Sequence, residues 1–210
     1  MPQPVHARIP LSLLEAIRRI DTPADEAETE YVQELRNKRL GLSDTVYEQI
    51  RRYSDAVKRG HQIPFAEASA LGTLIGRRTD ADALFESAGS IFAKDVYESI
   101  SSPVRAVIRS VPGMLARPLA VRQLETIAVR YLGGTLHRTG GFLTLQIPES
   151  VTVAGAPRSG GCVFYESALR ELLRLLVGSS AHVDHVQCSQ SGAGKCEWRA
   201  EWRHLTPQRT

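Results

Sequence analysis

A change of pattern at Gly133-Gly134 constrains the fold of this chain more than any other feature of its sequence. Before this pair, apolar residues recur at helical spacing between prolines and glycines, which predicts helices over residues 42–133. After it, Thr135–Thr139 and Phe142–Ile147 flank Gly140-Gly141, which is typical of a tight hairpin. One helix and a second hairpin follow. We therefore expect an α+β fold with a helical N-terminal half and a four-stranded antiparallel sheet (β-β-α-β-β), with helices packed on one face.

The helical half divides at recognisable end signals. Ser43 is a suitable N-cap and Gly60 a suitable C′ residue, so we expect a helix between them. Further helices are expected at residues 64–75, 79–100 and 118–132.

Domain organisation is expected to be simple. Prolines and an acidic run predict a loose N-terminal arm over residues 1–30, around one short helix at 12–20. Residues 31–204 then form a single α+β domain, with a helical part at 42–133 and a sheet and metal-binding part at 134–204.

The last third is predicted to contain a helix from Cys162 to Gly178, followed by strands at 181–188 and 195–203. In the final strand, Cys196 shares one face with Trp198, Ala200 and Trp202, whereas charged residues of alternating sign occupy the other. Cys196 should therefore face the core.

The chain contains three cysteines, Cys162, Cys188 and Cys196, and His185 lies three residues before the second. Three cysteines and a histidine suffice for a tetrahedral zinc site. Three cysteines cannot all pair, and the absence of an export signal predicts a reducing compartment, so a disulfide is disfavoured. The spacing lacks C-x-x-C pairs and therefore leaves buried structural thiols open as the alternative to metal.

His185 poses a geometric condition. In a regular strand, His185 and Cys188 point to opposite faces, so a bulge or an irregular strand end is required if both bind one ion. A solvated strand histidine is the alternative. His182 and Asp184 have the matching parity but lie roughly 20 and 13 Å from Cys188 along an extended strand.

The segment from Gly161 to Trp202 carries a more specific pattern. It reads G-C-V-F-Y-E-S-A-L-R-E-L-L and then H-V-D-H-V-Q-C-S-Q-S-G-A-G-K-C-E-W-R-A-E-W. This pattern resembles the 4-vinyl-reductase-like domain, which is related to the TRAPP vesicle-tethering subunits and the heme nitric-oxide-binding fold. That family has a cysteine opening a helix and a distal hairpin of the form E-x-x-C, Gly, C-x-[FW]. The intervals of 25 and seven residues between the cysteines match it, with His185 where the family commonly has Glu.

The resemblance implies a structural zinc ion on Cys162, His185, Cys188 and Cys196, because aromatic-sensing members bind zinc through the corresponding positions. A site closed by four protein ligands would serve folding rather than Lewis-acid chemistry. Members sense aromatic effectors, assist bacteriochlorophyll synthesis or act as ligand-binding modules. We expect a non-enzymatic small-molecule-binding or sensory module, with a tetrapyrrole vinyl-reduction enzyme or accessory protein and a TRAPP-like dimeric scaffold as alternatives.

A ligand pocket is expected between helices and sheet, where the ligand would be a small apolar or aromatic molecule. Candidate lining residues are Tyr131, Phe142, Phe164 and Tyr165, and ordinary aromatic core is the alternative. A heme or other tetrapyrrole has no supporting motif, and no dinucleotide or cluster motif is present to supply electrons.

Charge and hydropathy limit the remaining partners. The 26 basic and 23 acidic residues form no long basic block, so no nucleic-acid partner is expected. No apolar run approaches the ~20 residues that span a bilayer, which predicts a soluble protein. The absence of an export signal favours the cytoplasm. The resemblance further implies a homodimer, and a sensor without an output segment would need a regulatory protein partner.

Overall fold

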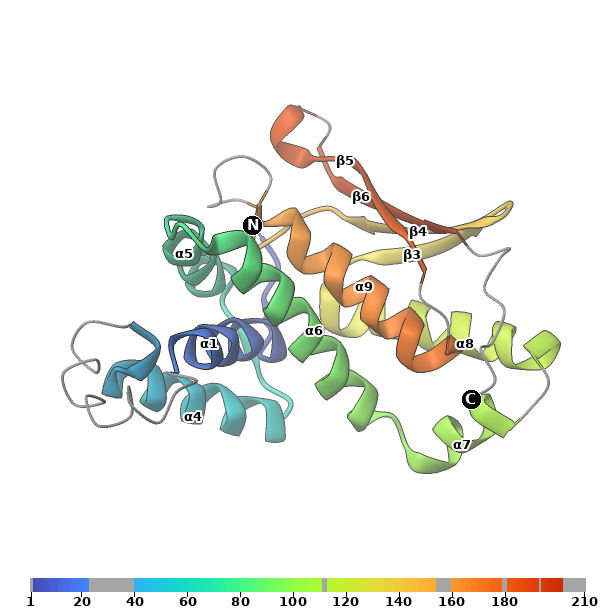
Figure 1. The fold of residues 1–210 in the computed structure, drawn as a ribbon, viewed down its shortest axis with the longest axis horizontal. Helices are drawn as coiled ribbons and strands as arrows, with labels where there is room; N and C mark the ends of the chain where they lie inside the picture. Colours follow the sequence, from blue (N-terminus) through green and yellow to red (C-terminus); the bar gives the residue numbers. More distant parts are fainter. Residues whose placement is uncertain are drawn as a thin grey trace.

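Helices lie against one face of a four-stranded sheet in the computed structural model, which describes residues 2–22, 40–110, 113–153, 160–178, 181–192 and 194–201 (Figure 1). The α-helices are α1 (Arg8–Asp21), α4 (Asp44–Lys58), α5 (Phe65–Gly76), α6 (Ala81–Ser99), α7 (Ser102–Ser110), α8 (Gly113–Ile127) and α9 (Cys162–Val177). The strands are β1 (Val5–His6), β2 (Gln62–Ile63), β3 (Thr135–Thr139), β4 (Phe142–Ile147), β5 (Val183–Gln187) and β6 (Cys196–Glu201). A π-helix, η2 (Ala128–Leu132), continues α8, and the 3₁₀ turns are η1 (Leu40–Leu42) and η4 (Ser189–Ser191).

The four-stranded sheet has the order β3-β4-β6-β5 and is antiparallel throughout. The first hairpin turns at Gly140, whose φ is +61°. On the inner face, Leu143 and Leu145 of β4 pair with Ala200 and Trp198 of β6, and all four side chains are fully buried. Helix α9 lies beneath this face (Figure 1). The predicted α+β fold with helices on one face is confirmed.

Helix α6 packs along α9 at very short range. A Cβ added at Gly89 of α6 would lie 2.3 Å from the carbonyl oxygen of Phe164 in α9, so a side chain here would force the helices apart. Ser167 of α9 also donates a 2.7 Å hydrogen bond to the carbonyl oxygen of Glu86 in α6. These contacts fix the position of α9, and with it the position of Cys162 at its start.

Residues 5–21 belong to the core, so the prediction of a loose arm is wrong for this segment. Strand β1 pairs with β2, and α1 packs against α4 and α6. The fully buried side chains of α1 are Ile9, Leu13, Ala16 and Ile17. The prediction treated the prolines as helix breakers. Pro10 instead occupies the first turn of α1, where a backbone N–H has no partner within the helix. Residues 23–39 lie outside the described residues, and with them the predicted boundary between residues 30 and 31.

A buried carboxylate ties the end of α1 to two later segments. Asp21 is 4% exposed and accepts a 2.8 Å hydrogen bond from the backbone N–H of Gly41. It also forms a 2.8 Å ion pair with Arg78, which pairs in turn with Asp80 at 2.8 Å. Hydrogen bonds to Asp80 and Asp21 raise the pKa of the Arg78 guanidinium. The network joins α1, η1 and the start of α6.

Between residues 43 and 133, the predicted helix ends follow their signals with one exception. Ser43 caps α4, because its hydroxyl oxygen accepts a 3.3 Å hydrogen bond from a first-turn N–H. Gly60 and Gly133 adopt the expected positive φ, at +67° and +66°. The exception is α8, which begins at Gly113, so that Pro118 lies inside the helix instead of opening it. The helix tolerates the missing N–H of this proline at the loss of one backbone hydrogen bond.

Candidate metal centre

Three cysteines from three different elements meet on the covered side of the sheet. Cys162 is the first residue of α9, Cys188 follows β5, and Cys196 is the first residue of β6. Their Sγ atoms all lie within 4.8 Å of one another, and the Cys162 and Cys188 sulfur atoms are 3.7 Å apart. All three are free thiols. The sulfur atoms are therefore close enough to bind one metal ion.

The sulfur separations are close to those of a tetrahedral thiolate site. A Zn–S bond of about 2.3 Å and a tetrahedral angle place two sulfur atoms about 3.8 Å apart. The Cys162–Cys188 distance of 3.7 Å already has this value. The other Sγ–Sγ distances are at most 4.8 Å, which is about 1 Å longer than in a tetrahedral zinc site. A side-chain rotation that moves one sulfur by this amount would close the difference.

A β-bulge brings Cys188 to the covered side. His185 and Gln187 pair with consecutive residues of β6, so Val186 is an extra residue in β5. Because of this extra residue, Gln187 faces outward and Cys188 comes opposite Cys196 on the inner face. The sequence required such an irregularity for His185 and Cys188 to share a face, and the structure has it between these two residues.

One turn, at residues 151–153, holds the segments that carry the cysteines. A Cβ at Gly161 would lie 2.2 Å from the carbonyl oxygen of Thr152, whose hydroxyl donates a 2.6 Å hydrogen bond to the Gly161 carbonyl. The start of α9 is thereby seated on the turn. Gln190, in η4 between the other two cysteines, donates a side-chain hydrogen bond to the carbonyl oxygen of Val153.

Hydrogen bonds favour a negative charge on Cys196. Its sulfur accepts from the backbone N–H of Ser189 at 3.3 Å and lies 3.3 Å from the hydroxyl of the same residue. The Cys162 thiol, the largest influence, and the Ser189 donors lower the pKa of Cys196 to about 5 against the opposing effect of burial. The same contact with Cys196, together with burial, raises the pKa of Cys162. A metal cation would displace the thiol protons, because cysteine binds metals as the thiolate.

His185 shares the inner face with the cysteines, but the structure does not bring it into their group. Its ring packs on Trp198, with a centroid distance of 5.3 Å and an interplanar angle of 30°. Trp198 packs on Tyr165 at 5.1 Å on α9. The Nε2 atom of His185 is buried and has no hydrogen-bond partner among the described residues. Three of the four predicted ligands therefore come together, and the fourth lies on an aromatic stack beside them.

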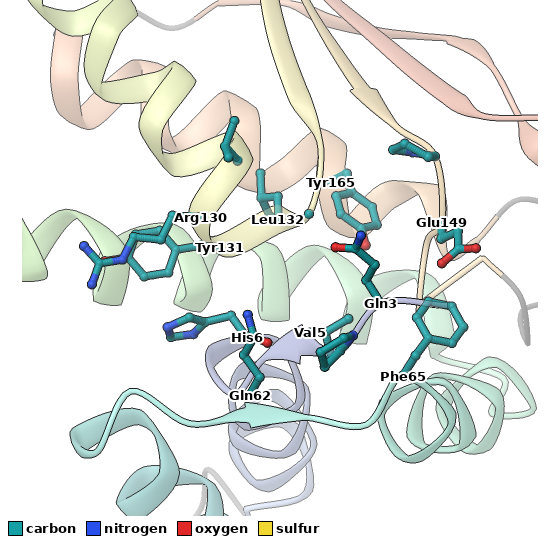
Figure 2. A pocket seen from close by; sticks show the side chains of 14 residues that line it. Gln3, Val5, His6, Gln62, Phe65, Arg130, Tyr131, Leu132, Glu149 and Tyr165 are labelled. Carbon is teal, nitrogen blue, oxygen red and sulfur yellow. The ribbon is translucent and has the colours of Figure 1, made fainter. Parts of the chain in front are cut away.

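A pocket of about 460 Å³ lies where the N-terminal segment meets η2 and α9 (Figure 2). Two of the predicted pocket residues, Tyr131 and Tyr165, line it. The further lining residues that matter for its chemistry are Gln3, Val5, His6, Phe65, Arg130 and Glu149. The N-terminal members were not among the predicted pocket residues, because the prolines of residues 1–30 predicted a loose arm there. The helical spacing of apolar residues in α1 was the signal that could have placed them.

The other two predicted pocket residues do not line this pocket. Phe142 starts β4 at the hairpin tip and is 44% exposed. Phe164 is fully buried in the core, with its ring 5.7 Å from Phe92 and 5.0 Å from Tyr165. Aromatic residues next to each other in a helix point in different directions, and the sequence alone does not tell which of them borders empty space.

Tyr131 is the centre of a charged cluster at one end of the pocket. The His6 ring meets it edge-on at 4.7 Å, and the guanidinium groups of Arg8 and Arg130 lie 5.6 and 5.3 Å from its centroid. Arg8 also forms an ion pair with Asp95 of α6. Burial, followed by the charges of Arg8 and Arg130, lowers the pKa of His6 to about 4, although Asp95 opposes the shift. The His6 ring is therefore neutral at pH 7.

Comparison with known proteins adds no assignment. No protein-family model matches the chain, and no curated protein matches it significantly. None of the described helices has the length and apolar character needed to cross a membrane.

Proposed function

We propose that this protein is a non-enzymatic small-molecule-binding module whose C-terminal layer is stabilised by a structural zinc ion. The observation that carries the proposal is the meeting of three sulfur atoms, from the start of α9, the residue after β5 and the start of β6, within 4.8 Å. Three thiols gathered from three elements are expected where a metal joins them, because buried thiols that only fill space need not be neighbours.

Zinc is the proposed ion because thiolate ligands favour soft or borderline metals and because zinc has no redox chemistry of its own. Cys162, Cys188 and Cys196 are the proposed sulfur ligands. His185 is the proposed fourth ligand, since the bulge places Cys188 on the same face as His185 and the Nε2 atom of His185 lacks a hydrogen-bond partner among the described residues. This ligation requires the ring to leave its present position on Trp198.

The proposed role of the ion is to join α9 to the second hairpin. A site closed by three cysteines and a histidine keeps no position for a reacting water, which favours a folding role over catalysis. Metal binding of this kind adds directly to the free energy of folding, because the ligands are separated in the unfolded chain.

The proposed ligand site is the pocket at Tyr131 and Tyr165. Its volume of about 460 Å³ falls within the ~300–1,000 Å³ typical of small-molecule sites. Tyr165 connects the two sites, because it lines the pocket and packs on Trp198, which contacts His185. A ligand in the pocket would therefore touch the aromatic stack that borders the metal centre.

Metal analysis of the purified protein tests the first half of the proposal. We expect one zinc per chain by native mass spectrometry, and at least tenfold weaker zinc binding for Cys188→Ser. Val186→Ser is the matched control, because it places the same side chain two residues away at a position that is 47% exposed. A wild-type protein that takes up no zinc, or equal affinities in all three proteins, would contradict the metal proposal.

A histidine pair tests the fourth ligand. His185→Gln should weaken zinc binding at least tenfold, whereas His182→Gln should not, since the His182 side chain is 82% exposed and pairs with Asp184. Equal zinc affinities of the two variants would remove His185 from the site while leaving the cysteine ligands in place.

A further inference from the structure

The pocket has two chemically different ends. Figure 2 shows His6, Arg130 and Tyr131 together at one end, and Phe65 and Glu149 at the other. Tyr165 and Gln3 lie between them. The wall is therefore aromatic, with cationic and donor groups at one end and a carboxylate at the other.

The His6 end presents hydrogen-bond donors. The Nδ1 atom of His6 accepts a 3.2 Å hydrogen bond from the backbone N–H of Arg8, so the neutral ring carries its proton on Nε2. This second nitrogen is a donor. Arg130 adds a guanidinium group that makes no ion pair with the described residues, whereas Arg8 is already paired with Asp95. Two donors, one of them charged, are thus available at this end.

The local potential at this end is positive. Burial and the two arginines lower the pKa of His6 to about 4, and the opposing influence of Asp95 is the smallest of the four. An anion placed there would meet a neutral donor at His6 and an uncompensated positive charge at Arg130. Charge-assisted hydrogen bonds of this type are stronger than neutral ones.

The backbone that carries Arg130 and Tyr131 is itself unusual. Both residues belong to the π-helix η2, which ends at Gly133 with a φ of +66°. π-Helical turns are rare and occur frequently at functional sites, because they redirect side chains that an α-helix would place elsewhere. This observation is independent of the charges and marks the same wall of the pocket.

We infer that the pocket binds a small planar organic acid, with its carboxylate between the Arg130 guanidinium and the His6 imidazole and its apolar body along Tyr131 and Tyr165. The inference rests on the proposed small-molecule function and adds the ligand class and its orientation. Glu149 sets the orientation, because it repels a carboxylate from the opposite end.

The matched probes 2-naphthoate and 2-naphthamide test this inference by titration calorimetry on the full chain. They have nearly the same shape and differ in charge. We expect 2-naphthoate to bind at least tenfold more tightly. Arg130→Gln should abolish this preference while 2-naphthamide binds as before, which shows that the variant is folded. Arg122→Gln, an exposed arginine on α8, is the control and should keep the preference.

Each outcome has a defined meaning. Equal binding of the two probes, or a preference that survives Arg130→Gln, overturns the organic-acid inference and leaves small-molecule binding intact. If neither probe binds, both the inference and the small-molecule part of the proposed function fail, whereas the zinc measurements are unaffected.

Discussion

Replacing Gly89 by alanine should destabilise the protein, although alanine favours a helix more than glycine does. At an exposed helical position, this change stabilises by roughly 1 kcal/mol. At Gly89, the new methyl group would lie 2.3 Å from the carbonyl oxygen of Phe164 and 2.9 Å from both the amide nitrogen of Ala168 and the Cβ of Ser167. Overpacking of this kind costs about 1–3 kcal/mol, and the upper value applies because two of the contacts are with backbone. The free energy of unfolding should therefore fall by about 2 kcal/mol.

Urea denaturation followed by circular dichroism measures this change. Ala83→Gly, at an exposed position of the same helix, is the matched control, and it should lose about 1 kcal/mol through helix propensity alone. The two substitutions run in opposite chemical directions, yet both should destabilise. A Gly89→Ala protein as stable as the wild type would refute the close approach of α6 and α9.

Three further predictions concern other parts of the structure. Asp21→Asn should lower the free energy of unfolding by about 2 kcal/mol, because it removes the buried one of the two carboxylates that pair with the half-buried Arg78 guanidinium and leaves only Asp80. The exposed Asp55→Asn should change it by less than about 0.5 kcal/mol in the same urea assay. The pKa of His6 falls from 6.5 to about 4 on folding, so the unfolded chain binds the proton first, and stability should be full above pH 6.5 and decrease as the pH falls to 4. The unscreened shift corresponds to about 3 kcal/mol, and solvent screening of the half-exposed ring reduces the expected loss to about 1–2 kcal/mol. His6→Gln should flatten this profile. Gly161→Ala should weaken zinc binding at least tenfold in a competition titration, because its methyl group would lie 2.2 Å from a backbone oxygen and displace the start of α9; unchanged affinity would show that this contact does not position the site.

Local pattern predicted much of the sheet. Alternation along β6 was enough to turn Cys196 and Trp198 inward, and both side chains are fully buried. The glycines at 140 and 178 have the positive φ expected of a hairpin turn and a helix end. Such features depend on neighbours in the sequence, so the residue types themselves carry the information.

The metal site was predicted only in part, because its geometry depends on pairing between distant strands. The sequence showed that His185 and Cys188 needed an irregularity between them. It did not show that Val186 is the extra residue, since that follows from the register of β5 against β6. The packing of the His185 ring on Trp198 is likewise a contact between strands that the spacing of residues does not encode.

The pocket was the least predictable feature for the same reason. One of its walls comes from β1, which pairs with β2 through Val5 and Ile63, residues far apart in the chain. Prolines near the N-terminus predicted a loose segment. Burial of the apolar face of α1 stabilises this segment by more than the nearby prolines destabilise it. His6 therefore becomes part of a site that the sequence assigned to four aromatic residues.

The bulge at Val186 has a consequence for recognising such sites in other chains. An extra residue in one strand leaves the pairing on both sides of it unchanged. A regular strand with the pattern His-x-C and a bulged strand with the pattern His-x-x-C therefore both direct the histidine and the cysteine to the inner face. Chains that differ by a one-residue insertion or deletion at this position can thus carry equivalent ligands. A sequence search that requires a fixed number of residues between the histidine and the cysteine would find only one of the two kinds of chain. A search that allows either His-x-C or His-x-x-C, followed by the cysteine of the next strand, would find both.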